Sequence, residues 1–263
     1  MLQIPIITIN TWKCDGNYRV RMLAMASQLK NLAPGIIACQ ECFFSEEGEA
    51  DTLHYLAGKL KMNYAFFPGR FKKRFFENNW VESYSGLGIL SKYPIKSTEH
   101  FQLPIVADDD DRKAMKTIIA LPDGSNLAIT NLHLTHLKDV VAGRILQAIE
   151  VAEVALRGRG NKYNLVCGDF NAEPGSKELT SFMKTAKAID CYIAGNGPEP
   201  RYSVTSQYYD HKHVCIDHIF SLPLPGKKDY PQFVNSGVVL NNVDSESGVY
   251  PSDHFGIATT LVI

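Results

Sequence analysis

Acidic, amide and imidazole side chains stand at the ends of several apolar segments of this sequence. The stretch "VCGDFNAEP" at 166–174 places Asp169 and Asn171 directly after an apolar run. Residues two apart in a β-strand point to the same face, so both side chains can address one point. Their oxygens are donors of the kind that hard divalent cations prefer. Gly168 precedes them, and a glycine suits a position where another group approaches the backbone closely. We expect it to leave room there for a water beside a bound metal ion.

Similar residues stand at the boundaries of other apolar segments. Some close a segment, namely Asn10; Gln40 and Glu41; and Asn131 and His133, followed by Thr135 and His136. Asp217 and His218 interrupt one segment, and Ser252, Asp253 and His254 precede the last one. A single residue of this kind is usually a turn former or a cap. Burying so many without partners would cost roughly several kcal/mol each. We therefore expect them to converge on one cleft, where they share hydrogen bonds, a metal ion or a substrate.

The residue types indicate which cation such a cleft would take. The carboxylates of Glu41, Asp169 and Asp253, with the amides of Asn10 and Asn171, form a set of oxygen donors. Such a set suits Mg²⁺, and Mn²⁺ by the same chemistry. A zinc site would need more histidine or cysteine in one cluster.

The histidines indicate proton transfer. His133 and His254 can move protons near neutral pH or stabilise a charged phosphoryl group. Asp217 can hold His254 in one tautomer, as the acid does in a catalytic triad. The sequence contains no G-x-S-x-G segment and no G-x-G-x-x-G or Walker loop, which argues against a serine hydrolase and against these nucleotide-binding loops.

Hydrophobic periodicity predicts the elements that carry these residues. We expect strands at 4–12, 36–41, 64–69, 86–95, 163–171, 214–220 and 255–263, and a hairpin at 115–134 that turns at Asp123-Gly124. We expect helices within 19–35 and at 51–60, 141–156 and 176–185. Strands joined by hairpins alternate with strands separated by helices, which predicts an α/β fold with mixed sheets and external helices.

Composition sets the remaining bounds. The chain has 263 residues, of which 45% are hydrophobic and 21% charged, values that fit one large globular domain spanning 1–263. With a net charge of −1, the protein as a whole is not electrostatically attracted to nucleic acid or anionic membranes. We find neither a signal peptide nor an apolar run long enough to span a membrane, so we expect a cytoplasmic protein; export by a route without such a segment stays open. The six cysteines are expected to be reduced, and the charge run at 108–112 to be a solvated loop.

Seven stretches together resemble the endonuclease/exonuclease/phosphatase superfamily, which includes DNase-like, abasic-site endonuclease and neutral sphingomyelinase branches. They are "INTW" (9–12), "CQE" (39–41), "GLGILSKYPI" (86–95), "NLHLTH" (131–136), "GDFNAEP" (168–174), "IDHIF" (216–220) and "SDHFGI" (252–257). They follow the order of that superfamily over nearly the whole chain. The resemblance implies a four-layer α/β/β/α sandwich, in which two packed mixed β-sheets are flanked by helices. It also implies a metal-dependent phosphoric ester hydrolase.

The resemblance also implies roles for individual residues. The metal ligands would be Glu41, its neighbour Asn10, and Asp253, directly or through water. The catalytic residues would be Asp169 and Asn171 on the attacking water, His254 with Asp217, and His133 on the phosphoryl oxygens. The resemblance leaves open whether Asp169 or His254 takes the proton of the water, and whether one metal ion or two are bound. It offers Glu82 only as a loose match for a partner of His133, and it suggests supporting roles for Arg112, Arg144 and Gln147.

Substrate is the least determined property. Residues 70–76, "RFKKRFF", interleave four cations with three aromatic side chains. They would form either a lip that grips phosphates and bases or lipid headgroups, or an exposed hairpin with snorkelling cations. We favour a nuclease-like phosphodiesterase acting as a monomer, with a phospholipid-directed phosphodiesterase or phosphatase as the alternative. An inactive binding module is disfavoured, because none of the eight expected site positions is lost.

Overall fold

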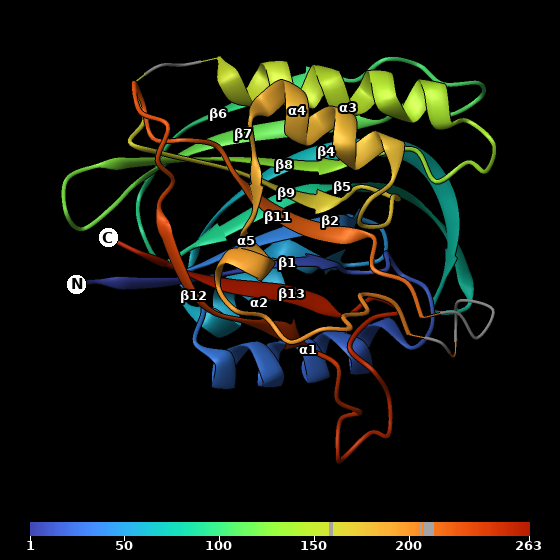
Figure 1. Ribbon diagram of the computed structural model, residues 1–263. Helices are drawn as coiled ribbons and strands as arrows, with labels where there is room; N and C mark the ends of the chain where they lie inside the picture. The colour runs from blue at the N-terminus through green and yellow to red at the C-terminus, as the bar shows by residue number, and fades with distance from the viewer. Residues whose placement is uncertain (158–159, 206, 208–212) are drawn as a thin grey trace.

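The computed structural model describes residues 1–157, 160–205, 207 and 213–263, and two β-sheets face each other in it (Figure 1). Sheet 1 has the order β12-β13-β1-β2-β5-β4, with β3 paired to β2. Its strands are β1 (Gln3–Asn10), β2 (Ile36–Ser45), β3 (Ala50–Asp51), β4 (Asn63–Phe76), β5 (Asn79–Ser91), β12 (Gln232–Val239) and β13 (Gly256–Val262). Sheet 2 has the order β10-β11-β9-β8-β7-β6. Its strands are β6 (Ile95–Gln102), β7 (Lys113–Ala120), β8 (Asn126–His133), β9 (Tyr163–Asp169), β10 (Ile189–Asp190) and β11 (Asp217–Ser221).

Helices cover the outer faces of both sheets. They are α1 (Tyr18–Leu32), α2 (Thr52–Leu60), α3 (Val141–Leu156) and α4 (Lys177–Ala186). The short α5 (Cys191–Ala194) instead contacts strands of both sheets, and its Cys191 and Tyr192 belong to the core between them. Figure 1 shows α3 and α4 beyond sheet 2, and α1 on the opposite side beyond sheet 1. The predicted four-layer sandwich is therefore confirmed. No helix in the described ranges is both long and apolar enough to cross a membrane.

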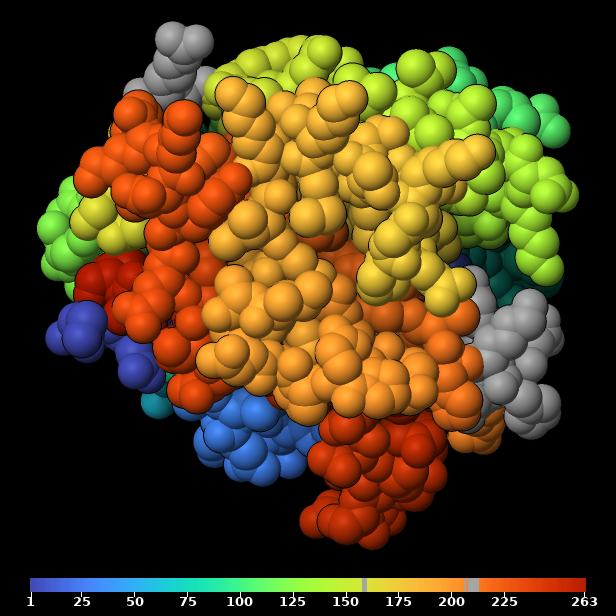
Figure 2. Space-filling view, in the orientation of Figure 1, coloured from blue at the N-terminus to red at the C-terminus, as the bar shows by residue number. Residues whose placement is uncertain are grey.

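Alternation along the strands builds the apolar layers. Ile6 of β1 packs between the two sheets, whereas its neighbour Ile7 packs on the other side with residues of α1 and α2. A third apolar cluster joins sheet 2 to α3 and α4. All six cysteines, each within the described ranges, carry free and buried thiols, as the sequence predicted. In the space-filling view, segments coloured yellow to orange cover the near face between the two helical layers (Figure 2).

Four strands were not predicted, namely the two-residue strands β3 and β10 and the longer strands β6 and β12, and two predicted strands pair in one long hairpin. β6 and β12 lie at the edges of the sheets and expose many polar side chains, so they lack the apolar pattern of the central strands. The predicted strands at 64–69 and 86–95 belong to the long hairpin β4–β5. The single domain at 1–263 and the monomeric state stay predictions.

Register sets where the polar strand ends meet. β1 and β2 are parallel, with Asn10 opposite Gln40, and β8 and β9 are parallel, with His133 opposite Asp169. β11 runs antiparallel to β9 and places Asp217 opposite Asp169. These ends lie together at the opposite end of the sandwich from the two termini (Figure 1).

Gly168 has a different neighbour from the one expected. We predicted that it leaves room beside the bound water and metal, but its φ is 143° and an added Cβ would lie 2.1 Å from the carbonyl oxygen of Leu132. The group that approaches is therefore the backbone of the adjacent strand β8, and the glycine is required by strand packing.

Candidate active site

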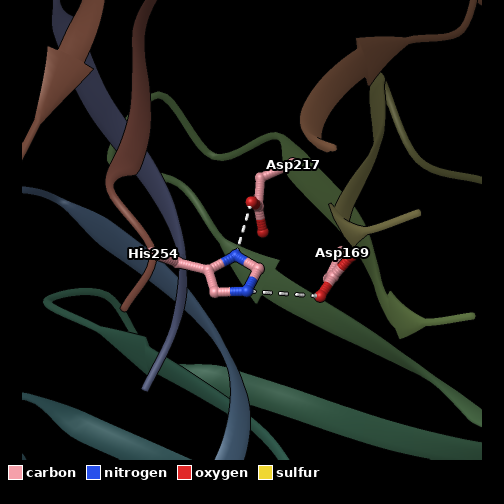
Figure 3. Close-up of side chains that lie close together, drawn as sticks. All are labelled: Asp169, Asp217 and His254. Carbon is pink, nitrogen blue, oxygen red and sulfur yellow. Dashed lines mark hydrogen bonds and ion pairs between the residues drawn. The ribbon is translucent and has the colours of Figure 1, made fainter. Parts of the chain in front are cut away.

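Sheet 2 contributes a row of three ionisable side chains. His133, Asp169 and Asp217 lie in register on β8, β9 and β11, and His254 approaches them from the segment before β13. Nδ1 of His254 is 2.8 Å from Oδ2 of Asp217, and its Nε2 is 4.0 Å from Oδ2 of Asp169. Figure 3 shows the imidazole ring between the two carboxylates. Nε2 of His133 reaches the same Asp169 oxygen at 3.4 Å.

Burial and neighbouring charges give these groups different protonation states. Burial raises the pKa of Asp169 to about 7, and the Asp217 carboxylate acts in the same direction. Burial lowers the pKa of His254, but the charge of Asp217 outweighs it and raises that pKa to about 10. Burial and then the charge of Arg112 lower the pKa of His133 well below its usual range. At neutral pH the site therefore combines a protonated His254 with a neutral His133 and a partly ionised Asp169.

Asn171 reaches the site by a route that strand alternation does not describe. β9 ends at Asp169, and Asn171 has a left-handed φ of 48°. Its backbone N–H donates to Oδ1 of Asp169 at 2.9 Å, and its side-chain amide donates to the carbonyl of Leu134 at 3.1 Å. The amide is thus fixed beside Asp169 by a turn after the strand, and the expected period of two does not apply.

Sheet 1 contributes Asn10 and Glu41 from the other side. The side-chain amide of Asn10 donates to Oδ2 of Asp169 at 3.2 Å, which joins the ends of β1 and β9 across the two sheets. Glu41 has a φ of 53° and lies in an irregularity of β2 between Cys39 and Cys42. A bulge of this kind turns one side chain away from the regular alternation, so the Glu41 carboxylate points into the cleft.

Asp253 and His254 are held by their neighbour Ser252. The hydroxyl of Ser252 donates to the carbonyl of Asn10 at 2.7 Å and accepts the N–H of His254 at 3.2 Å. Burial raises the pKa of Asp253, an effect that His254 opposes and the nearby charge of Glu41 reinforces. The serine therefore anchors this pair of residues to the end of β1.

One cleft of about 1190 Å³ unites the predicted residues. Seven of the eight line it, namely Asn10, Glu41, His133, Asp169, Asn171, Asp253 and His254. The eighth, Asp217, is fully buried behind His254. Residues that are distant along the chain therefore converge as the sequence predicted.

Several other strand-end residues lie outside the cleft. The side-chain amide of Gln40 donates to Oδ1 of Asn131 at 2.7 Å, and both residues are fully buried between the sheets. His218 packs among aromatic rings and contacts the carbonyl of Ala172 at 2.9 Å, and burial lowers its pKa to about 4. Gln40 and Asn131 therefore join the two sheets beneath the floor of the cleft, and His218 belongs to the core.

The charge run at 108–112 is only partly the solvated loop that we expected. Asp109 is 4% exposed, and its Oδ2 accepts from Nε of Arg112 and from the hydroxyl of Thr135, both at 2.7 Å. Arg112 also contacts His136. Counting charges missed this cluster, because a run of aspartates does not reveal which one is buried against an arginine.

Arg144 and Gln147 have the supporting roles that were expected. Arg144 donates to the carbonyls of Thr135 and Leu137, each at 2.9 Å, and Oε1 of Gln147 accepts the N–H of Thr135 at 3.0 Å. Together they fix the segment that follows His133.

The sequence analysis also missed Arg21. This α1 residue is 2% exposed and donates to five backbone carbonyls, those of Thr11, Trp12, Lys13, Asp15 and Pro251. It fastens the loop after β1 to the segment that carries Asp253 and His254. An arginine in a helix with few other cues resembles a solvated residue, so no sequence signal identified it.

A family model for the "Endonuclease/Exonuclease/phosphatase family" matches residues 7–254. The chain belongs to this family. Members of the family hydrolyse phosphoester bonds, so the chain is a phosphoric ester hydrolase. No curated protein matched it in a sequence comparison.

Solved structures of the endonuclease/exonuclease/phosphatase family share the fold. A family protein from Leptotrichia buccalis has a TM-score of 0.77 at 16% identity, covering 99% of this chain and 100% of its own. Humanized D. rerio TDP2 has a TM-score of 0.76 at 18% identity, covering 99% of each chain. The Bacteroides thetaiotaomicron mannosyl-6-phosphatase has a TM-score of 0.72 at 19% identity, covering 99% of this chain and 100% of its own.

Within the part of the chain that the structure describes, two groups of side chains could hold a cation. Ligand atoms of Asp169, Asp217 and His254 all lie within 4.8 Å of one another. In that group, however, His254 and Asp217 are hydrogen-bonded to each other at 2.8 Å, which engages Nδ1 of His254 and Oδ2 of Asp217. Glu41 and Asp253, with the oxygen of Asn10, form a second group of oxygen donors lining the cleft. Their chemistry fits Mg²⁺ or Mn²⁺, because these ions prefer carboxylate and amide oxygens.

Glu82 lies away from this site. Its side chain is exposed on β5, opposite Lys73, and its N–H donates to Oε2 of Glu47 at 2.9 Å. Among the described residues, no hydrogen bond or ion pair joins it to His133. The neighbour that does approach His133 is Asp169.

Proposed function

We propose that this protein is a divalent-metal-dependent phosphodiesterase of nuclease-like specificity, which hydrolyses its substrate by in-line attack of an activated water. The observation that carries the proposal is the convergence of Asp169 and His254 with Glu41 and Asp253 in one cleft. A proton acceptor, a protonated donor and a pair of hard-oxygen ligands are the parts that phosphoester hydrolysis needs.

We assign the water's proton to Asp169. A group with a pKa near 7 accepts protons efficiently at neutral pH, and Asn171 is hydrogen-bonded beside it to help hold the water. His254 stays protonated through its contact with Asp217 and faces the same space as a hydrogen-bond donor and positive charge. Neutral His133, on the other side of Asp169, donates to a phosphoryl oxygen.

Glu41 and Asp253 would hold the divalent ion, with Asn10 as a third oxygen donor. When bound, such an ion neutralises charge on the phosphoryl and leaving oxygens. The amide of Asn10 also donates to Asp169, so a hydrogen bond links one proposed metal ligand directly to the proposed base. The charge of Glu41 disfavours ionisation of Asp253, and a cation between the two carboxylates would relieve this repulsion.

The surroundings of the cleft favour a substrate with several phosphates. Arg70, Lys72 and Arg74 alternate along β4, share one face of the strand and line the cleft. Trp12, Phe75 and Trp80 line the same cleft and offer rings on which bases can stack. A row of cations with aromatic rings suits a single-stranded polynucleotide better than one lipid headgroup. The folds of a phosphatase and of TDP2 "complexed with single strand DNA product" are both similar, so the fold alone does not choose.

One panel tests the proposal. The purified protein with Mg²⁺ is assayed on single-stranded and duplex DNA, a phosphoinositide, sphingomyelin, a sugar phosphate and a chromogenic phosphodiester. We expect metal-dependent cleavage of single-stranded DNA and of the chromogenic diester, reduced about 100-fold or more in Glu41→Ala. Glu153→Ala, on the exposed side of α3, is the matched control and should stay active. Full activity in EDTA or in Glu41→Ala would refute the metal-dependent mechanism, and cleavage of lipid alone would refute the substrate class.

A further inference from the structure

A lysine stands beside the carboxylate that we assign as the main metal ligand. Nζ of Lys13 is 3.2 Å from Oε2 of Glu41 and 3.7 Å from Oδ2 of Asp15. Lys13 lines the same cleft as Asp253. The side chain of Glu41 is 15% exposed, so water screens this ion pair less than it would at the open surface.

The backbone holds Lys13 in this place. Trp12 and Lys13 have left-handed φ values of 55° and 39°, a conformation that is costly for side-chain-bearing residues. The N–H of Lys13 donates to the carbonyl of Glu41 at 3.2 Å, and the loop carbonyls are held by Arg21. Local strain persists only where the surrounding structure enforces it. The strained loop backbone therefore fixes Lys13 so that its ammonium lies beside Glu41.

We propose that Lys13 is an internal counter-ion for Glu41 which a divalent cation must displace, so that Lys13 sets the metal affinity of this site. The inference rests on the proposed function only in taking Glu41 as a metal ligand. A divalent ion bound to Glu41 would lie within a few ångströms of the ammonium. At such a distance two like charges repel strongly wherever the effective dielectric constant is below that of water. The ammonium must therefore swing away as the ion binds, or weaken its binding.

Arg74 is a second cation whose charge interacts with that of Glu41. It is 8% exposed, and its guanidinium donates to the hydroxyl and the carbonyl of Ser83 at 2.8 and 3.3 Å. Arg74 is thus fixed on β4, whereas the flexible stem of Lys13 can release Glu41. The displaceable charge is that of Lys13.

Metal binding measured directly tests this inference. Mn²⁺ is titrated into the wild-type protein, Lys13→Met and Lys13→Arg, with free Mn²⁺ followed by electron paramagnetic resonance, and thermal unfolding is recorded in EDTA. We expect Lys13→Met to bind Mn²⁺ about tenfold more tightly, since a nearby positive charge is removed. Its unfolding temperature in EDTA should fall, because Glu41 and Asp15 lose their counter-ion. Lys13→Arg should bind like the wild type, and Lys30→Met, an exposed lysine of α1, controls for net charge.

The background of Glu41→Gln separates the possible failures. In this background Lys13→Met should no longer raise Mn²⁺ affinity, because the carboxylate contested by both cations is gone. Unchanged or weaker affinity in Lys13→Met, with hydrolysis still dependent on metal and on Glu41, would overturn the role of Lys13 and leave the proposed function intact. Absence of Mn²⁺ binding in every variant would overturn both.

Discussion

The two sides of the cleft are built by different means. On the side of sheet 2, regular pairing places His133, Asp169 and Asp217 in one row across three adjacent strands. On the side of sheet 1, the functional groups stand on departures from regularity. Glu41 lies in a strand irregularity, and the loop at Trp12 and Lys13 has a left-handed backbone.

In the proposed function the two sides of the cleft therefore have different tasks: the sheet 2 side handles the proton, and the sheet 1 side binds the cation. On the sheet 2 side, His133 and His254 contact Asp169, and His254 contacts Asp217. Burial and neighbouring charges strongly shift the pKa values of Asp169 and His254. The sheet 1 side is partly open and carries a charged group that can move. We infer that register fixes the groups that handle the proton, whereas the loop and the bulge adapt to a cation that comes and goes.

Asp169→Asn should have the largest effect, because it removes the proton acceptor from the regular side. We expect kcat to fall about 1000-fold with the fold retained, measured on the chromogenic diester. The pKa of Asp169 is raised from 3.8 to about 7, so the stability contributed by its protonated form is lost as pH rises through that interval. The variant should lack this part of the pH dependence in urea unfolding. Activity within tenfold of the wild type would assign the base to another group.

Asp217→Asn should act through pH. The pKa of His254 is raised from 6.5 to about 10 by Asp217 against the effect of burial. The stability that this pair contributes is complete below pH 6.5 and is lost as pH rises through 10, and a step that needs the imidazolium fails over the same range. In the variant, burial acts without the opposing charge, so the alkaline limb of kcat should move to lower pH by at least about one unit.

A kcat profile from pH 6 to 10.5 measures this shift, with urea unfolding at both extremes. Asp217→Glu is the matched variant, since it keeps the charge and should keep most of the alkaline limb. An unchanged limb in Asp217→Asn would show that His254 does not need this partner to stay protonated.

The same contrast explains what the sequence could predict. The convergence of the site side chains on one cleft was predicted from polar residues at the boundaries of apolar segments, because the ends of neighbouring strands lie together. The roles given to Glu41, Asn10 and Asp253 came from family resemblance, and their meeting in the cleft agrees with it. Local pattern predicted mixed sheets with external helices, because central strands and amphipathic helices carry strong periodic signals. The four-layer arrangement itself came from the family resemblance.

Features that depend on distant contacts escaped prediction. Arg21 joins the loop after β1 to the carbonyl of Pro251, 230 positions away, and nothing near Arg21 in the sequence marks it. Asp109 looked solvated because its neighbours are aspartates. Gly168 and Asn171 were placed correctly beside the site, but for reasons of strand packing and turn geometry that a period of two does not contain.

Arg21→Met tests whether the loop after β1, on the sheet 1 side of the cleft, depends on the hydrogen bonds from Arg21. The substitution leaves loop carbonyls without their donor, and a buried group that loses its partner costs roughly 1–3 kcal/mol. We expect a lower unfolding temperature and a fall of about tenfold in kcat, because the end of β1 and the segment that carries Asp253 and His254 lose their fixed relation. Arg21→Lys should be intermediate, and Arg157→Met, on an exposed arginine, should behave as the wild type. Normal kcat in a destabilised Arg21→Met would show that the loop holds its own shape.

Lys72→Gln should give the smallest effect. It tests whether the cations of β4, on the sheet 1 side of the cleft, bind the substrate. Lys72 is exposed on the cleft-lining face of β4, and no ion pair engages it in the described part of the chain. It is therefore free to contact a phosphate of a long substrate without touching the chemistry. We expect KM for a single-stranded oligonucleotide to rise about threefold and the salt dependence of binding to weaken by about 0.7 in log–log slope. Turnover of the small chromogenic diester should not change. Lys30→Gln gives the control for charge, and an equal effect in both variants would indicate net charge alone and remove the β4 row from substrate binding.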